Sequence, residues 1–100
     1  MSEGNQQRAV DAVMLMMQLA IRVKVESKRE SLEDVVGVTV IPSTEDAEGA
    51  SLVLNSPRYN AARDELLEAG ALERDHETEE QSGAPEAFKI TRSGIELLPI

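Results

Sequence analysis

The sequence from Ser56 to Leu98, SPRYNAARDELLEAGALERDHETEEQSGAPEAFKITRSGIELL, contains the signals that decide the fold. Ser56 can cap a helix by accepting a hydrogen bond from its first amides, and Pro57 suits the first helical position. Apolar residues then recur at helical spacing and share one face: Tyr59, Ala62, Leu66 and Ala69. Gly70 suits the left-handed conformation that ends many helices. These signals together predict a helix over residues 56–70.

Two strands and a short helix are predicted after Gly70. Residues 71–74 begin a strand, and residues 76–85 are polar, which predicts a hairpin loop. In the return strand, residues 87–90, Phe88 and Ile90 fall on one face and Lys89 on the other. Thr91 then caps a last helix over residues 92–98. A hairpin over residues 71–91 would need support from the helices, because an isolated two-stranded hairpin is only marginally stable.

This order of elements resembles the C-terminal half of a winged helix-turn-helix domain of the bacterial transcriptional-regulator type. The matching segments are DELLEAGAL (Asp64–Leu72) and FKITRSGIELL (Phe88–Leu98). In that family the recognition helix ends in Leu-x-x-x-Gly-apolar-apolar, and the wing closes in apolar-Thr-x-x-Gly-x-x-apolar-apolar. The resemblance implies an α+β, mostly helical fold with a recognition helix at 56–70. It also implies a two- or three-stranded wing sheet at 71–91 and a last helix at 92–98.

The N-terminal segment, residues 1–30, predicts a long helix over residues 6–30. Apolar residues recur there in steps of three and four, which builds one wide face rich in Met. This face fits core or homodimer packing, or an adaptable binding surface. Residues 20–26 also alternate between apolar and charged, so an early strand stays open. Four cations follow one another closely and fit either a phosphate-facing patch or a solvated helix end: Arg22, Lys24, Lys28 and Arg29.

The middle of the chain matches the family less well. Ser31 followed by acids predicts a short capped helix over 31–36, and the β-branched residues 38–41 predict a strand. Residues 43–54 predict another helix, which Gly49 weakens. The positioning helix that the family places before its recognition helix is therefore either 43–54 or 31–36.

Composition limits the functional classes. The 100 residues form one expected domain, with 10 Lys and Arg against 19 Asp and Glu and a net charge of −9. The chain has no Cys and one His, which excludes thiolate and multi-His metal sites. His76 lies among glutamates, and we interpret it as a solvated loop residue rather than a metal ligand. No catalytic motif is present, so we expect no enzyme activity, no cofactor and no metal. The longest apolar run has six residues, Ala12–Met17, so we expect no membrane span and a cytoplasmic location.

The resemblance implies DNA contacts from the recognition helix, at Ser56, Arg58, Tyr59, Asn60 and Arg63. Arg can read guanine, Asn can read adenine, and a helix N-terminus can hold a phosphate. The function expected first is a dimeric transcriptional regulator that binds double-stranded DNA.

The charge of the wing opposes this expectation. Acids crowd the hairpin, and Glu79 and Glu80 are expected at its tip, where they would repel phosphates. Replacement of Glu79 by Lys would then strengthen non-specific DNA binding. The alternative function is an acidic protein-interaction module that binds a basic protein partner. The state of Arg58 and Arg63 separates the two: exposed and unpaired arginines favour DNA, and arginines bridged to acids favour protein docking.

Overall fold

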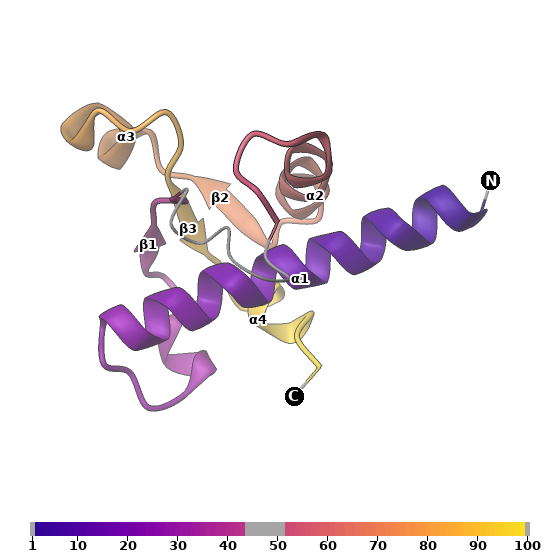
Figure 1. The fold of residues 1–100 in the computed structure, drawn as a ribbon. Coiled ribbons are helices and arrows are strands. Elements are labelled where there is room, and N and C mark those ends of the chain that lie inside the picture. Colours follow the sequence, from indigo (N-terminus) through magenta and orange to yellow (C-terminus); the bar gives the residue numbers. More distant parts are fainter. Residues whose placement is uncertain (1, 44–51, 100) are drawn as a thin grey trace.

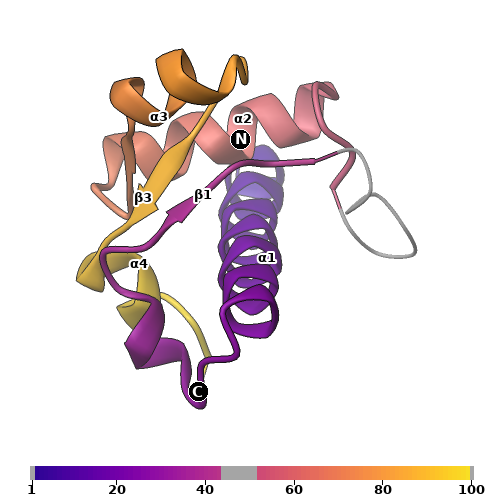
Figure 2. The same cartoon turned by 90° about the vertical axis from the view of Figure 1, so that its left-hand side faces the viewer.

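Helix α1 (Ser2–Glu26) is the longest element, and helices α2 and α4 and strand β1 contact it (Figure 1). The computed structural model describes residues 2–43 and 52–99 of the chain. The buried apolar residues of α1 recur at helical spacing and line one side of the core: Ala12, Leu15, Met16, Leu19, Ala20 and Val23. Figure 2 looks almost along α1 and shows the sheet strands β1 and β3 beside it. Among the described residues, no helix is both long enough and apolar enough to cross a membrane.

A small antiparallel sheet forms the second part of the α+β fold. Its three strands are β1 (Thr39–Val40), β2 (Leu72–Arg74) and β3 (Phe88–Ile90), in the order β1-β3-β2. In this register Lys89 lies between Thr39 and Glu73 on the outer face. Phe88 and Ile90 point the other way, into the core, as their spacing predicts.

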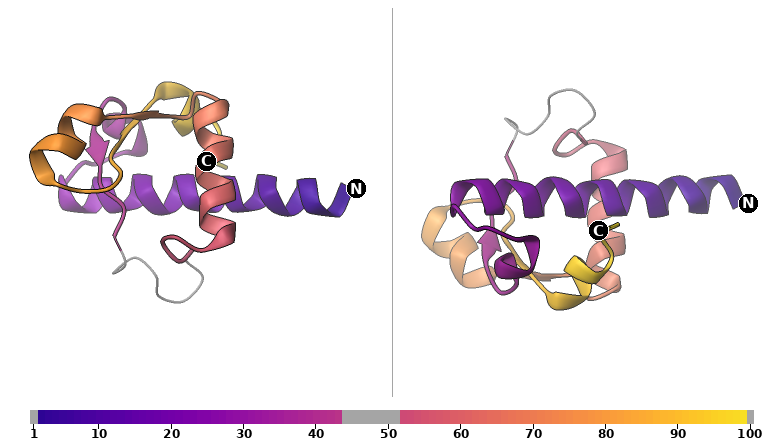
Figure 3. Two further views of the ribbon diagram at one scale, coloured as in Figure 1. Left: turned by 90° about the horizontal axis from the view of Figure 1, so that it is seen from above. Right: turned by 90° about the horizontal axis from the view of Figure 1, so that it is seen from below.

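Helix α2 (Pro57–Glu68) follows the predicted limits closely. The Ser56 hydroxyl accepts a hydrogen bond from the Tyr59 amide at 3.1 Å, so the predicted cap is confirmed. Gly70 has φ +74°, a conformation that an L-residue with a side chain rarely adopts. The chain therefore turns directly from α2 into β2. Seen from above, α2 crosses α1 steeply (Figure 3).

The short helix α4 (Arg92–Glu96) is attached to the turn after α2. Thr91 accepts a hydrogen bond from the Gly94 amide at 3.1 Å, which confirms its predicted role as a cap. Its hydroxyl also lies within donating distance of the Gly70 and Ala71 carbonyl oxygens, at 2.6 and 2.9 Å. Gly94 is buried against Ala71 and Met16, where a β-carbon would overlap both. The Thr-x-x-Gly segment thus joins the end of the sheet to the end of α2.

The predicted hairpin loop over residues 76–85 is wrong, because it contains helix α3 (His76–Ser82). Asp75 caps this helix by accepting a hydrogen bond from the Thr78 amide, and Gly83 ends it with φ +74°. Acids in the first turn, Glu77 and Glu79, favour the helix through its dipole. The signals for a helix were present, but the polar composition concealed them.

Three other expectations are corrected. The first helix ends at Glu26 rather than residue 30, since Lys28 has φ +55° and breaks it; the strand alternative for 20–26 is wrong. The segment 31–36 holds only a short 3-10 helix, Leu32–Val35, and the Ser31 side chain makes no capping bond. Of the helix expected over 43–54, residues 44–51 lie outside the described residues, and Leu52 to Leu54 are not helical.

Candidate nucleic-acid interface

Arg58, in the first turn of α2, is bound to Asp11 of α1. Its Nε and Nη2 atoms donate to the two Asp11 carboxylate oxygens at 2.9 and 2.6 Å, a two-bond pairing that fixes the guanidinium plane. The Arg58 side chain is 59% exposed, whereas the Asp11 side chain is 4% exposed. The arginine therefore covers a buried acid, beside a groove of about 340 Å³ between α1 and α2.

The ionised state of Asp11 depends on this pairing. The hydrogen bond from Arg58 lowers the pKa of Asp11, and a second bond from Gln7 at 2.9 Å adds to the effect. Burial acts in the opposite direction, because desolvation disfavours the carboxylate. The same hydrogen bond raises the pKa of Arg58. Both side chains are therefore ionised, and the pair carries no net charge.

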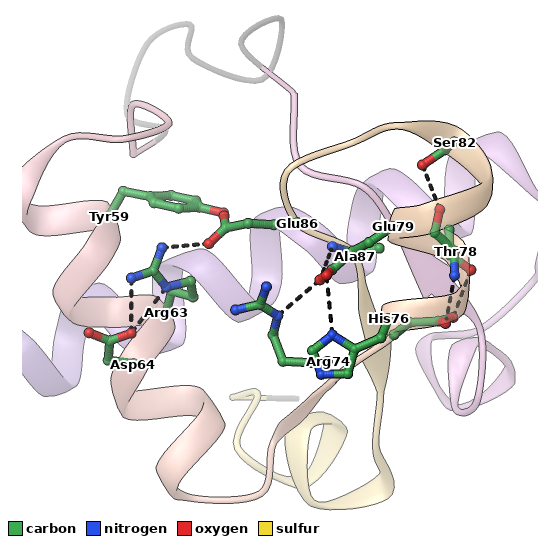
Figure 4. A network of polar contacts seen from close by, with 11 residues as sticks. Tyr59, Arg63, Asp64, Arg74, His76, Thr78, Glu79, Ser82, Glu86 and Ala87 are labelled. Carbon is green, nitrogen blue, oxygen red and sulfur yellow. Dashed lines mark hydrogen bonds and ion pairs between the residues drawn. The ribbon is translucent and has the colours of Figure 1, made fainter.

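Arg63, further along α2, is held by the acids Glu86 and Asp64 (Figure 4). It also donates to the Asn60 side-chain oxygen. Its Nη1 donates to Glu86 at 2.5 Å, and its Nη2 forms an ion pair with Asp64 at 3.0 Å. The side chain is only 19% exposed. Its guanidinium carbon also lies 6.0 Å from the centre of the Tyr59 ring, within the range of a cation–π contact.

Tyr59 belongs to the core and not to the surface. It is 1% exposed, and its hydroxyl donates to the second oxygen of Glu86 at 3.1 Å. Burial, followed by the charge of Glu86, raises the pKa of Tyr59 well above its ordinary value. Glu86, located just before β3, therefore binds Tyr59 and Arg63 together, and we call these three residues the Glu86 clasp. The clasp fixes α2 to the segment that enters β3.

The structure brings all five predicted DNA-contact residues to the N-terminal half of α2, and each of them takes part in an internal contact. The Ser56 hydroxyl is used in capping, and the Asn60 oxygen accepts from Arg63 at 3.3 Å. Asn60 is half-buried. Arg58 keeps its Nη1 without a hydrogen-bond partner among the described residues. The assignment of these residues to DNA stays a prediction.

The acidic segment from β2 to β3, residues 73–86, is more ordered than its composition indicates. Glu79 does not lie at a solvated tip: its side chain is 14% exposed, accepts from Arg74 at 2.9 Å, and accepts from the Ala87 amide at 3.2 Å. The hydrogen bond from Arg74 is the main cause that lowers the pKa of Glu79. Its second oxygen lies 3.3 Å from Nδ1 of His76, which is 77% exposed. Glu79 thus organises the base of α3, and Glu80 remains exposed.

Asp75 joins three elements of the fold. Its carboxylate accepts from the Thr39 hydroxyl of β1 at 2.6 Å, and from the amide and hydroxyl of Thr78 in α3. These bonds, with Thr39 first, lower the pKa of Asp75 to about 2. In sequence, the only sign of this role is an Asp three residues before a Thr, which is a helix-cap pattern.

The cations at the end of α1 differ in whether they have partners within the protein. Arg22 donates to the Ile41 carbonyl oxygen at 2.7 Å and pairs with Glu26 at 3.0 Å. Lys28 and Arg29 are exposed, and neither forms an ion pair within the described part of the chain. Within that same part, no three side chains of His, Cys, Asp or Glu gather in a way that could hold a metal ion.

Comparison with known proteins finds no match to a family model, to a curated protein or to a solved structure.

Proposed function

We propose that this protein is a protein-interaction module of winged-helix type that binds a basic protein partner. The observation that carries the proposal is the pairing of Arg58 with Asp11 and of Arg63 with Glu86 and Asp64. An arginine that reads DNA must present its donors to base edges or phosphates. To contact DNA, Arg63 would have to break its hydrogen bonds to acids in a largely buried site. This costs more free energy than the release of bound water from an exposed arginine.

Exposed acids on the surface around α2 favour a positively charged partner over DNA. They are spread over α2, β2 and α3: Asp64, Glu68, Glu73, Glu77 and Glu80. With a net charge of −9, the chain as a whole attracts cations and repels phosphates. Electrostatic complementarity of this kind favours a partner with a Lys- and Arg-rich surface and speeds their encounter.

A labelled peptide of about 20 residues, rich in Lys and Arg, and a DNA duplex of similar length test this proposal by fluorescence anisotropy. We expect the peptide to bind at about 50 mM salt and to dissociate as salt rises, and the duplex not to bind. The variant Glu77→Lys/Glu80→Lys should weaken peptide binding about fivefold, which corresponds to about 1 kcal/mol. Its matched control is Glu33→Lys/Asp34→Lys, with the same charge change on two exposed acids of the distant 3-10 helix. Equal weakening by both variants would contradict a specific acidic surface.

DNA binding is the second candidate, and one observation favours it. The Arg58 side chain is 59% exposed and retains unused donors at the N-terminal turn of α2. A phosphate there would be bound in addition to Asp11 rather than instead of it. Salt-sensitive duplex binding, lost in Arg58→Ala but kept in Arg92→Ala, would establish this candidate and overturn the first.

A further inference from the structure

The surface groove between α1 and α2 carries more positive than negative charge. Each helix contributes three residues to its lining: Gln7, Arg8, Asp11, Pro57, Arg58 and Ala61. Two of these are arginines and one is an aspartate, so the lining is cationic in a chain of net charge −9. The groove therefore offers an anion a positive surface, in contrast to the exposed acids of α2, β2 and α3.

The guanidinium of Arg58 has one donor edge occupied and one open. Its five N–H groups lie in one plane and form two forks, Nε with Nη2 and Nη1 with Nη2. Asp11 occupies the first fork, at 2.9 Å from Nε and 2.6 Å from Nη2. The second fork has no acceptor among the described residues. It has the geometry to bind a further carboxylate through two hydrogen bonds, and the pairing with Asp11 holds it in place.

Asp11 supports the open fork and does not block it. Its Oδ1 accepts from Arg58 and from Gln7, and its Oδ2 accepts from Arg58. With both oxygens bound and the side chain almost fully buried, a carboxylate at the second fork meets the guanidinium and not the Asp11 oxygens. Arg8, which also pairs with Glu65 at 2.9 Å, adds a second positive charge to the groove.

Two neutral features of the groove fit the end of a polypeptide chain. Gln7 turns its amide nitrogen toward Asp11, so its Oε1 remains open to accept a hydrogen bond from a peptide N–H. Pro57 and Ala61 lie one turn apart on α2 and supply an apolar surface without a charged group.

The openness of the groove favours a chain end over a small molecule. Gln7, Pro57 and Arg58 are all exposed, so a small molecule would remain largely in water, whereas drug-sized ligands are usually about 70–90% enclosed. A polypeptide adds contacts outside the groove. Basic residues of the same chain would lie near exposed acids farther along α2, such as Glu68.

We infer that this groove binds the C-terminal end of a partner polypeptide whose last residue is aliphatic. The terminal carboxylate pairs with the open fork of Arg58, and the last peptide N–H donates to Oε1 of Gln7. The last side chain packs on Pro57 and Ala61. Capture of a terminal carboxylate by fixed donors is an established mode of peptide recognition. The inference rests on the proposed function in one respect, that the partner is a protein.

Two peptides that differ only in their C-terminal group test the inference by ¹⁵N chemical-shift mapping. Both are N-acetylated and neutral in sequence, with about eight Gly and Ser residues followed by Leu, and one ends in a carboxylate and the other in an amide. The carboxylate form should shift the amide signals of Arg8, Arg58 and Ala61 with a Kd of about 1 mM, and the amide form should bind about tenfold more weakly. The net charge of −9 opposes this order, so non-specific attraction does not produce it. Equal affinities would overturn the inference.

Arg58→Lys tests the open fork. Lysine keeps the positive charge and can still pair with Asp11, but its single ammonium lacks the two forks of a guanidinium. The preference for the carboxylate form should fall from about tenfold to less than about twofold, with unchanged far-UV circular dichroism. The matched control is Arg92→Lys, at an exposed arginine outside the groove, which should keep the preference. Equal effects of both variants would overturn the inference.

A second variant pair leaves the bonds between Arg58 and Asp11 untouched. Ala61→Glu places a negative charge in the groove and should abolish binding of the carboxylate form. Ala69→Glu makes the same change at the end of α2, outside the groove lining, and should retain binding. Binding that persists in Ala61→Glu would overturn the inference.

Two further titrations separate this inference from its alternatives. Isocaproate has the carboxylate and the aliphatic part of the last residue without a peptide N–H; if it bound as tightly as the peptide, the groove would be a small-carboxylate site and the inference would be overturned. Shifts in α3 with the Lys- and Arg-rich peptide, and none in the groove with the neutral carboxylate peptide, would overturn the inference and leave the proposed function standing. The reverse result would overturn the proposed acidic surface and leave the inference standing.

Discussion

Replacement of Arg63 by Ala separates an arginine that holds the fold from one that reads DNA. The pair with Asp64 is worth little, because that carboxylate is 55% exposed and surface pairs contribute about 0–1 kcal/mol. The bond to Glu86 matters more, since the Glu86 side chain is 13% exposed. Without Arg63, the Tyr59 hydroxyl would be its one remaining hydrogen-bond partner among the described residues. Loss of a hydrogen bond to a charged, largely buried group costs about 1.5–3 kcal/mol. We therefore expect the free energy of unfolding to fall by about 2 kcal/mol.

Urea denaturation followed by circular dichroism measures this loss. A fall of about 2 kcal/mol corresponds to a Tm decrease of roughly 8–16 °C for a domain of this size. The control is Arg92→Ala, which removes the same charge from an exposed arginine without an ion-pair partner among the described residues, and it should change stability by less than about 0.5 kcal/mol. If Arg63→Ala were as stable as the unmodified chain, the Glu86 clasp would contribute nothing and the structural reading of Arg63 would be refuted.

Three further predictions concern the polar contacts and the packing. The pKa of Asp75 is about 2 in the fold against an ordinary 3.8, so the unfolded chain binds more protons between these values and stability falls as the pH drops through them. Urea midpoints of the unmodified chain and Asp75→Asn should therefore differ above about pH 4 and converge near pH 2; a gap that is the same at every pH would contradict this. Gly94→Ala would place a carbon 2.9 Å from the Met16 sulfur and closer still to the Ala71 carbonyl oxygen. This overpacking, at the upper end of about 1–3 kcal/mol, should outweigh the gain of about 1 kcal/mol from removing a helical glycine, and an unchanged midpoint would count against it. Glu79→Lys should lower the urea midpoint, because it removes the carboxylate that accepts hydrogen bonds from Arg74 and from the Ala87 amide. Glu80→Lys should leave the midpoint unchanged, and equal effects would show that Glu79 has no organising role.

Local signals made the C-terminal half of the fold predictable from sequence. Caps at Ser56 and Thr91 and the glycine at 70 each act within a few residues, so helix limits and strand positions follow from reading the chain. Helix α3 has the same kind of signals, an Asp cap and a terminal glycine. It was missed because its seven residues contain no apolar stripe, and periodicity is the stronger guide.

The chemistry of the candidate site could not be predicted in the same way. Arg58 pairs with an acid 47 positions away, and Arg63 pairs with one 23 positions away. Such pairings depend on how α1 crosses α2 and on where β3 begins, which local patterns do not determine. From the sequence, the state of Arg58 and Arg63 was expected to separate the two functions, and only the tertiary structure showed that both are bridged to acids.

Chemical-shift mapping on uniformly ¹⁵N-labelled protein tests the central claim most directly. The chain is titrated at about 50 mM salt, once with the Lys- and Arg-rich peptide and once with the duplex. The proposed function predicts that the peptide shifts amide signals of α3 and β2, around Glu77, Glu80 and Glu73, and that the duplex shifts none. Saturable shifts at the N-terminal turn of α2 with the duplex, and none in α3 with the peptide, would contradict it and assign the protein to DNA.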